Sequence, residues 1–472
     1  MPCLRRLFAP VLALCFAASI YASTPPNIVF ILADDMGYGD AGCYGQKTLT
    51  TPHMDRMAAE GMRFTRHYAG CTVCAPSRCV LMTGLHTGHC RVRGNGPGFI
   101  PDTDLTVPKM LKSAGYATAL AGKYGLGLPL PLDDPKQKGF DHAYGYVATS
   151  HAHNCFTDFL VRDGAKTPLR NTIIYGTENK QHEGTGVAEA KGRVDFAPLL
   201  IANDVQQYLD ARGKDKKPFF LYYALNLPHA NNEAKKDSPL GHGLECPDYG
   251  EYAGKDWPAV EKGFASVMRF VDNEVGAVLA KLKAVGLDDN TIVMFSSDNG
   301  PHHEGFHDSE FFHSNGGLKG TKRDMTDGGI RVPLIVRWPG KIKAGIVSEH
   351  VSGFQDLMPT LAELSGAELG KGYDGISFAP TLLGQGKQSQ HDYLFWNFDE
   401  QGGKRAVLKW PWKLIHLNTG EGGKGAKGKA KPMETLLYNL DTDRGEEHDL
   451  AAKKPELVKE LEAMMIEAYR AP

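Results

Sequence analysis

The chain has 472 residues, a formal net charge of −2 and a sequence pI of about 6.8, and 42% of its residues are hydrophobic. This length suits one large domain and one small one, and the composition is that of an ordinary globular protein. The balanced charge argues against a protein that binds nucleic acid or an acidic membrane surface.

The first 23 residues have the pattern of an export signal. Arg5 and Arg6 precede an apolar run over residues 7–20, which is too short to span a membrane, and small residues close the segment. We therefore expect residues 1–23 to be a signal peptide. The mature protein is expected to be periplasmic or secreted, without stable insertion into a membrane.

Four short apolar runs are predicted to be buried strands that end in polar side chains. They occupy residues 27–35, 116–123, 218–229 and 291–300, and end at Asp34 and Asp35, at Lys123, at His229, and at Asp298 and Asn299. Helical patterns lie between these runs, for example at residues 196–211 and 264–282. Alternating strands and helices predict an α/β fold with a large, mostly parallel sheet sandwiched by helices. Because sites in such sheets form at the carboxyl ends of the strands, these polar residues should meet.

From about residue 390 the pattern changes to short strands without helices between them, followed by one amphipathic helix. We therefore predict a catalytic domain over residues 24–388 and a smaller C-terminal α+β subdomain with an antiparallel sheet over residues 389–472. A stretch rich in Gly and Lys at residues 420–432 has no apolar content and is predicted to be a mobile surface loop.

The polar residues at two of the strand ends have the chemistry of a metal site. Asp34, Asp35, Asp298 and Asn299 offer only oxygen ligands, which suit Ca²⁺ or Mg²⁺ and are poor for a soft metal. Acids that follow a strand are about as often caps or turn formers, so neither pair is decisive alone. Two such pairs at two predicted central strands favour a metal site.

The stretch CTVCAPSR, residues 71–78, contains Cys71 and Cys74 at the spacing of a redox or zinc pair. A structural zinc site needs a second pair of cysteine or histidine ligands at matching spacing, and the sequence offers none. Seven cysteines lie outside the predicted signal peptide, and their uneven spacing predicts no particular disulfide pairing.

The residues that follow Cys74 indicate a different role for this cysteine. Cys74-Ala-Pro-Ser-Arg78 followed by CVLMTG resembles the signature of the formylglycine-dependent sulfatases, the arylsulfatase-like type I family of the alkaline-phosphatase superfamily. NIVFILADDMGYGD and SSDNGPHHEG are similar to that family's two metal strands, and GGLKGTK with GGIRVP to its lysine loop. The resemblance implies hydrolysis of sulfate monoesters after a formylglycine-generating enzyme has oxidised Cys74. For an exported enzyme, a sulfated carbohydrate is the expected substrate.

The resemblance also implies roles for individual residues. Ca²⁺, with Mg²⁺ less favoured, would be held by Asp34, Asp35, Asp298, Asn299 and the modified Cys74. The remaining roles fall to Arg78, which would orient the formylglycine, and to Lys123, His229 and Lys322, which would contact the sulfate. One hydroxyl of the aldehyde hydrate would attack sulfur, and the other would then expel sulfate.

One position departs from the family pattern. The family often has a histidine where this chain has Gly125. Histidines elsewhere could replace it, and the candidates are His151, His153, His302 and His303, of which His153 is favoured. Sugar specificity is expected to come from loops around residues 91–104, 129–160 and 230–257, with Arg91, Arg93 and Trp257 among the candidates.

Two alternatives remain at this point. The first is a phosphate or phosphonate monoester hydrolase of the same superfamily. A dianionic phosphate favours a second metal ion, and the sequence shows no spare cluster of ligands for it. The second is a catalytically silent protein that binds sulfated glycans, for which an unmodified Cys74 would be the sign.

Overall fold

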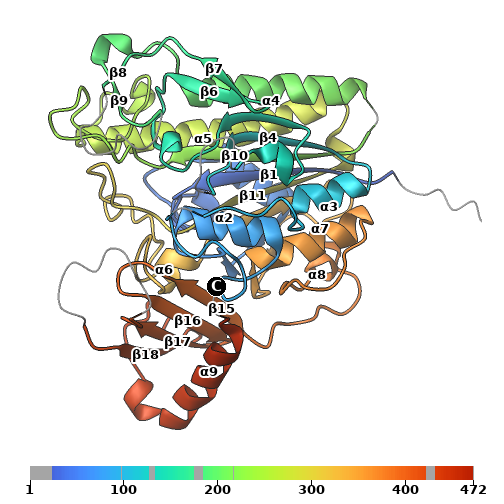
Figure 1. Ribbon diagram of the computed structural model, residues 1–472, viewed down its shortest axis with the longest axis vertical. Helices are drawn as coiled ribbons and strands as arrows, with labels where there is room; N and C mark the ends of the chain where they lie inside the picture. The colour runs from blue at the N-terminus through green and yellow to red at the C-terminus, as the bar shows by residue number, and fades with distance from the viewer. Residues whose placement is uncertain are drawn as a thin grey trace, which may run out of the picture.

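The computed structural model describes residues 24–96, 98–126, 133–174, 184–215, 217–420 and 431–470. The predicted signal peptide and most of the Gly- and Lys-rich stretch therefore lie outside the described residues. A ten-stranded sheet lies between helices, and a separate four-stranded sheet lies at one end of the molecule (Figure 1). The predicted combination of a large, mostly parallel sheet and a small antiparallel sheet is confirmed.

The strands of the large sheet run in the order β13-β2-β12-β11-β1-β10-β4-β5-β6-β7. Their bounds are β1 (Asn27–Asp34), β2 (Met62–Phe64), β4 (Ala117–Lys123), β5 (His142–Tyr146), β6 (Phe159–Arg162), β7 (Ala165–Pro168), β10 (Phe219–Pro228), β11 (Thr291–Ser297), β12 (Leu334–Arg337) and β13 (Ile346–Ser348). The neighbours β11, β1, β10 and β4 pair in parallel and are the four strands predicted from the sequence. Antiparallel pairs occur only toward the two edges, among the described residues of this sheet.

Helices cover both faces of this sheet. Their bounds are α1 (Pro52–Glu60), α2 (Cys74–Thr83), α3 (Val107–Ser113), α4 (Ala197–Lys214), α5 (Ala259–Ala284), α6 (Asp327–Ile330), α7 (Leu357–Ser365) and α8 (Ala379–Leu383). Along β1, Ile28 and Phe30 pack in one core with α2, α3 and α7, while Val29 and Ile31 pack in the other with α1, α4 and α5. All of β1 is therefore buried, as its continuous apolar run predicts. No helix in the described part of the chain has both the length and the apolar character needed to cross a membrane.

The C-terminal part forms the small sheet, drawn in red in Figure 1. Its strands β15 (Leu394–Phe398), β16 (Lys404–Lys409), β17 (Trp412–Leu417) and β18 (Glu434–Asn439) pair antiparallel in chain order. Helix α9 (Pro455–Ala468) packs on one face through Leu461 and Met465. The other face packs against Tyr68, at the end of β3 (His67–Tyr68), and against Val73, which immediately precedes α2.

A buried ion cluster joins the small sheet to the large domain. The Lys413 ammonium, on β17, lies 2.6 Å from a carboxylate oxygen of Asp327 and 2.7 Å from one of Glu446, and all three side chains are inaccessible to solvent. Arg331 contacts the second Asp327 oxygen at 3.1 Å. Charges removed from water in this way must stay paired, so the cluster fixes how the two sheets dock.

We therefore expect Lys413→Met to lower the free energy of unfolding by about 3–5 kcal/mol, because it leaves buried Glu446 without a cation and Asp327 with Arg331 alone. The measurement is denaturant unfolding followed by intrinsic fluorescence. Lys409→Met is the matched control, since Lys409 forms an exposed pair with Glu460 and its loss should cost less than about 1 kcal/mol. Equal losses in the two variants would contradict a structural role for the buried cluster.

Candidate active site

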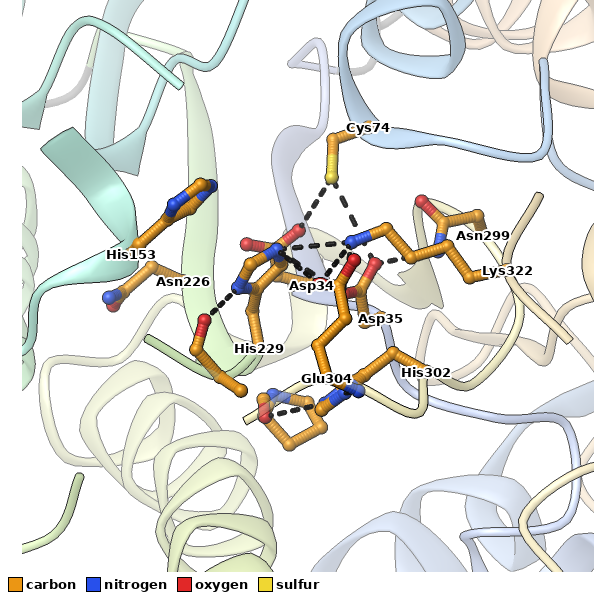
Figure 2. A network of polar contacts seen from close by, with 12 residues as sticks. Asp34, Asp35, Cys74, His153, Asn226, His229, Asn299, His302, Glu304 and Lys322 are labelled. Carbon is orange, nitrogen blue, oxygen red and sulfur yellow. Dashed lines mark hydrogen bonds and ion pairs between the residues drawn. The ribbon is translucent and has the colours of Figure 1, made fainter. Parts of the chain in front are cut away.

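The carboxyl ends of the four central strands meet at one edge of the sheet. β1 ends at Asp34, β4 ends at Lys123, His229 follows β10, and Asp298 follows β11. Each of these side chains is 3% exposed or less. Figure 2 shows Cys74 close to Asp34 and Asp35, so segments far apart in the sequence come together here.

Three carboxylates form a compact cluster with the sulfur at position 74. Asp34, Asp35, Asp298 and Cys74 each place one ligand atom within 4.8 Å of the others. The Asp35 N–H donates to Asp298 Oδ1 over 3.1 Å, and the Asn299 amide donates to Asp35 Oδ1 over 2.7 Å. Asp35 has a φ of 63°, a left-handed conformation that non-glycine residues adopt rarely and often at functional sites. The structure thus brings together all five predicted metal ligands, Asn299 included.

This cluster fits a hard divalent cation. The Asn299 Oδ1 atom is buried without a hydrogen-bond partner, which is costly unless a cation or a donor satisfies it. Burial and the negative charge of Asp34 raise the pKa of Asp298 to about 7, since several carboxylates share a small, dry space. A bound divalent ion would relieve both penalties, and an all-oxygen set is the kind that Ca²⁺ and Mg²⁺ prefer.

Helix α2 presents Cys74 to this cluster. The helix begins at Cys74, whose Sγ lies 3.4 Å from Asp34 Oδ1. Four residues later, on the same face of the helix, Arg78 donates from Nε to Asp298 over 2.9 Å and from Nη1 to the Lys123 carbonyl over 2.8 Å. Burial, and then the negative charge of Asp34, raise the pKa of the Cys74 thiol well above its ordinary value.

The structure gives no support to a redox or zinc pair at Cys71 and Cys74. The Cys71 thiol donates to the Asn397 carbonyl at 3.5 Å, whereas Cys74 faces Asp34. All seven cysteines of the described residues are free thiols. Cys71 therefore contacts the small sheet, whereas Cys74 contacts the carboxylate cluster.

Two lysines complete the charge around the cluster. Lys123 Nζ lies 2.7 Å from Asp34. Lys322 Nζ has three acceptors, which are Asp35 at 2.8 Å, Glu304 at 2.8 Å and His229 Nε2 at 3.1 Å. Since an ammonium group carries three N–H bonds, these contacts use all of them. Burial opposes the charge of Lys322, but the carboxylates of Asp35 and Glu304 outweigh it and raise its pKa.

His229 is held as a neutral acceptor. Its Nδ1 lies 2.6 Å from the Ala230 carbonyl and therefore carries the proton, while Nε2 accepts from Lys322. Burial and the positive charge of Lys322 lower the pKa of His229 to about 3. At neutral pH the charged proton donor of this pair is therefore Lys322.

Glu304 was missed in the sequence analysis. Its carboxylate lies 2.8 Å from Lys322 and 2.6 Å from Nη1 of Arg323, and the side chain is 14% exposed. Burial opposes ionisation of Glu304, yet Lys322 lowers its pKa far below the ordinary value. Its position in the same SSDNGPHHEG stretch as Asp298 and Asn299 was the available signal.

His153 and His151, two of the candidates to replace the missing histidine, differ in their distance from the site. The ring of His153 stacks on that of His229 with centroids 4.7 Å apart, so His153 lies beside the site (Figure 2). His151 points elsewhere, because its Nε2 contacts the Thr157 hydroxyl at 2.9 Å and the Phe159 carbonyl at 3.0 Å. Of these two, the structure brings only His153 to the site.

Steric crowding explains why position 125 is a glycine. A Cβ atom there would lie 2.9 Å from Lys123 Cε and 3.2 Å from Arg78 Cδ, and Gly125 has a φ of 69°. A side chain at this position would displace two cations of the site and strain the backbone. A histidine could not be restored at position 125 without rearranging Lys123 and Arg78.

The polar contacts of Arg93 in the structure are with the protein backbone. Its guanidinium is buried and donates to the carbonyls of Gly88, Cys90 and Arg470, so it ties the C-terminal segment to the loop after α2. Trp257 packs within an aromatic cluster. Structural contacts therefore account for both side chains.

Comparison with known proteins points in one direction. The family model described as Sulfatase matches residues 26–367, and the one described as N-sulphoglucosamine sulphohydrolase, C-terminal, matches residues 320–467. Arylsulfatase A of Homo sapiens is 32% identical to this chain, over 96% of the chain and 90% of the human protein. N-acetylgalactosamine-6-sulfatase of Rattus norvegicus is also 32% identical, over 80% of the chain and 70% of the rat protein.

The fold has solved relatives as well. A structure connected with the metabolism of multiple glycosaminoglycans by Bacteroides thetaiotaomicron superposes with a TM-score of 0.73 at 25% sequence identity. The match covers 94% of this chain and 98% of the other. Agreement at this level extends across both the large and the small sheet.

We expect His153→Ala to lower kcat for an aryl sulfate by about a hundredfold, because loss of a group that handles a proton typically costs 10²–10⁴-fold. His151→Ala is the control, two residues away and outside the site, and should reduce thermal stability more than kcat. Both variants are checked by thermal melting. An unchanged kcat in well-folded His153→Ala would remove His153 from the chemistry.

Proposed function

Since the chain belongs to the sulfatase family and is a sulfuric ester hydrolase, we propose that its substrate is a sulfated carbohydrate. We further propose that its nucleophile is a formylglycine hydrate derived from Cys74 and that its metal ion is Ca²⁺. The proposal includes maturation by a formylglycine-generating enzyme and a periplasmic or secreted location, as the N-terminal pattern predicts.

The observation that carries this proposal is the surroundings of Cys74. Reactive cysteines lie in electropositive sites that lower the thiol pKa, whereas burial and Asp34 raise that of Cys74. Without a bound cation, an unmodified thiol here would stay protonated. An aldehyde hydrate would supply one hydroxyl to attack sulfur and a second whose deprotonation expels sulfate. The carboxylates beside position 74 are placed to accept the first proton, since Asp34 Oδ1 lies 3.4 Å from Sγ.

The metal would be held by Asp34, Asp35, Asp298, Asn299 and the modified residue 74. A divalent ion there would stabilise the deprotonated nucleophile and the charge on the sulfate oxygens. The unpartnered Asn299 Oδ1 and the three clustered carboxylates support this assignment. A site without thiolate or imidazole among these oxygen ligands favours Ca²⁺ over softer ions.

The cations of the site have separate tasks. Arg78 is held rigidly by Asp298 and the Lys123 carbonyl, so it would fix the orientation of residue 74. Lys123 would balance the charge of the sulfate oxygens. Lys322 would give a proton to the leaving oxygen as the bond from sulfur to that oxygen breaks, because its neighbour His229 is neutral.

The carbohydrate assignment rests on the relatives. The rat relative is named for a sulfated amino sugar, and the solved structure comes from work on glycosaminoglycan metabolism. A sulfated sugar also suits an exported enzyme better than a small aryl ester does. Turnover of a panel of N-acetylgalactosamine 4- and 6-sulfates, glucosamine 6-sulfate and 4-methylumbelliferyl sulfate identifies the sugar and the sulfated position.

The geometry speaks against a two-metal phosphate hydrolase. Asp35, His302 and Glu304 are close enough for a second ion, but both nitrogens of His302 already have backbone partners. Its Nε2 contacts the Pro228 carbonyl at 3.2 Å, and its Nδ1 accepts from the Glu304 N–H at 3.0 Å. An imidazole engaged in this way has no lone pair left for a metal.

Treatment with a chelator should abolish turnover and lower the melting temperature, and added Ca²⁺ should restore both. Ca²⁺ at a hundred times its Kd stabilises the folded protein by about 2.7 kcal/mol. Asn299→Ala is expected to weaken Ca²⁺ binding in isothermal titration, since it removes a neutral oxygen ligand. Full turnover by a protein that elemental analysis finds free of metal would overturn the metal assignment.

The peptide containing Cys74 should carry the mass of the aldehyde when the protein is made with a formylglycine-generating enzyme. Cys74→Ser should fold normally in the same host, because the side chain is similar in size, and should release almost no sulfate from the substrate panel. Cys71→Ser is the control and should keep its activity. A purely thiol-containing protein with full turnover would contradict the formylglycine proposal, and a thiol-containing, inactive one that binds sulfated glycans would favour the silent binding protein.

A further inference from the structure

Glu304 is an unexpected charge in a site proposed to bind an anion. Its carboxylate lies beside Lys322, and its Oε2 is 3.4 Å from His229 Nε2 (Figure 2). Arg323 also pairs with this carboxylate. A negative charge at this point weakens the attraction of a sulfate group for Lys322. The charge of Lys322 does not require Glu304 for its neutralisation, because Asp35 already contacts the same ammonium group at 2.8 Å.

The backbone around Glu304 is rigidly placed. Its N–H donates to His302 Nδ1 over 3.0 Å, and the carbonyl of the next residue, Gly305, accepts from the Gly243 N–H over 2.9 Å. A Cβ atom on Gly305 would lie 2.6 Å from the Cβ of Ala230, so the loop approaches its neighbours as closely as glycine permits. Glu304 is therefore preorganised.

Two neighbours of Glu304 have strained backbones. Arg323 has a φ of 79°, and Phe306 has a φ of 71° with its side chain 47% exposed. Long and bulky side chains adopt this conformation at a cost of about 1–3 kcal/mol, and such strain clusters where ligands are bound. Arg323 is ion-paired with Glu304 and Phe306 follows it by two residues, so both strained positions adjoin Glu304.

We propose that Glu304 is a specificity-determining residue, which accepts a hydrogen bond from the sugar hydroxyl nearest the sulfate. This inference rests on the proposed function. Lys322 would give a proton to the leaving oxygen. Because the Glu304 carboxylate contacts the same ammonium group, it would lie next to the leaving alcohol. A carboxylate has about four acceptor positions, and Lys322 and Arg323 occupy one on each oxygen. The remaining positions and the 14% exposure of the side chain leave room for a hydroxyl donor.

The test combines enzyme variants with substrate analogues. The substrates are the sulfated sugar of the panel that the unaltered enzyme hydrolyses fastest, its deoxy analogue lacking the hydroxyl nearest the sulfate, and 4-methylumbelliferyl sulfate. The variants are Glu304→Gln, Glu304→Ala and the control Glu310→Gln, an exposed glutamate of the same loop. kcat and KM are measured separately, and thermal melting checks the fold of each variant.

With the unaltered enzyme, removal of the hydroxyl should lower kcat/KM by about 10–100-fold, the range for a hydrogen bond to a charged group. With Glu304→Ala the same removal should change kcat/KM by less than about threefold. Both Glu304 variants should lose at least about tenfold more activity toward the sugar than toward the aryl sulfate. Glu310→Gln should behave like the unaltered enzyme.

Other outcomes separate this inference from the function on which it rests. Equal losses toward sugar and aryl substrates would show that Glu304 acts only through Lys322, and would overturn the specificity role alone. If removal of the hydroxyl lowered kcat/KM as much in Glu304→Ala as in the unaltered enzyme, the specificity role would also be overturned. Hydrolysis of the aryl sulfate but of no sulfated sugar by the unaltered enzyme would overturn both the carbohydrate assignment and the role of Glu304.

Discussion

The site depends on the pairing of buried acids with buried bases at the carboxyl edge of the sheet. Each acid has a cation within about one hydrogen-bond length, and the pairs are Asp34 with Lys123 at 2.7 Å, Asp298 with Arg78 at 2.8 Å and Asp35 with Lys322 at 2.8 Å. Charges taken out of water are tolerated only in such arrangements. A divalent ion that binds the acids would loosen their hold on the cations, and the cations would then have N–H groups to offer to an anion.

Much of this arrangement can be predicted from the sequence. The four central strands are continuous apolar runs, and the polar residues at their ends must meet because parallel strands end at the same edge. The motif around Cys74 added the proposed nucleophile and Arg78, which stand on one face of a short helix. Local sequence pattern and sheet topology are therefore sufficient to predict the central strands, the residues at their ends and the position of Cys74.

The rest of the site depends on tertiary contacts that have no local pattern. Glu304 is an ordinary glutamate in a loop until Lys322 and Arg323 fold against it. Arg93 is a basic residue in a loop, typical of a ligand site, yet three carbonyls of the folded chain occupy it. His153 and His151 differ by two positions in the sequence, and only the course of the chain decides which of them reaches His229.

The small sheet contributes to the site although it supplies none of the proposed metal ligands. Asn95 accepts the Ala75 N–H at the start of α2 over 3.0 Å, and Glu400, which follows β15, accepts the Asn95 N–H over 2.5 Å. The first N–H groups of a helix have no partner within the helix, so this chain of contacts satisfies one of them. The orientation of residue 74 therefore depends on the docking that Lys413 maintains between the two sheets.

The two sides of the site are built from different kinds of element. Strand ends and α2 hold the side of the proposed nucleophile, with Asp34, Lys123 and Arg78 fixed by the core beneath them. Loops hold the proposed leaving-group side, where Glu304 and Lys322 lie. Rigid elements preserve the geometry that bond formation at sulfur requires, whereas loops accept substitutions without disturbing the sheet. A fold arranged in this way can keep one chemistry while its substrate changes, because the residues proposed to contact the alcohol are not those proposed to hold the metal.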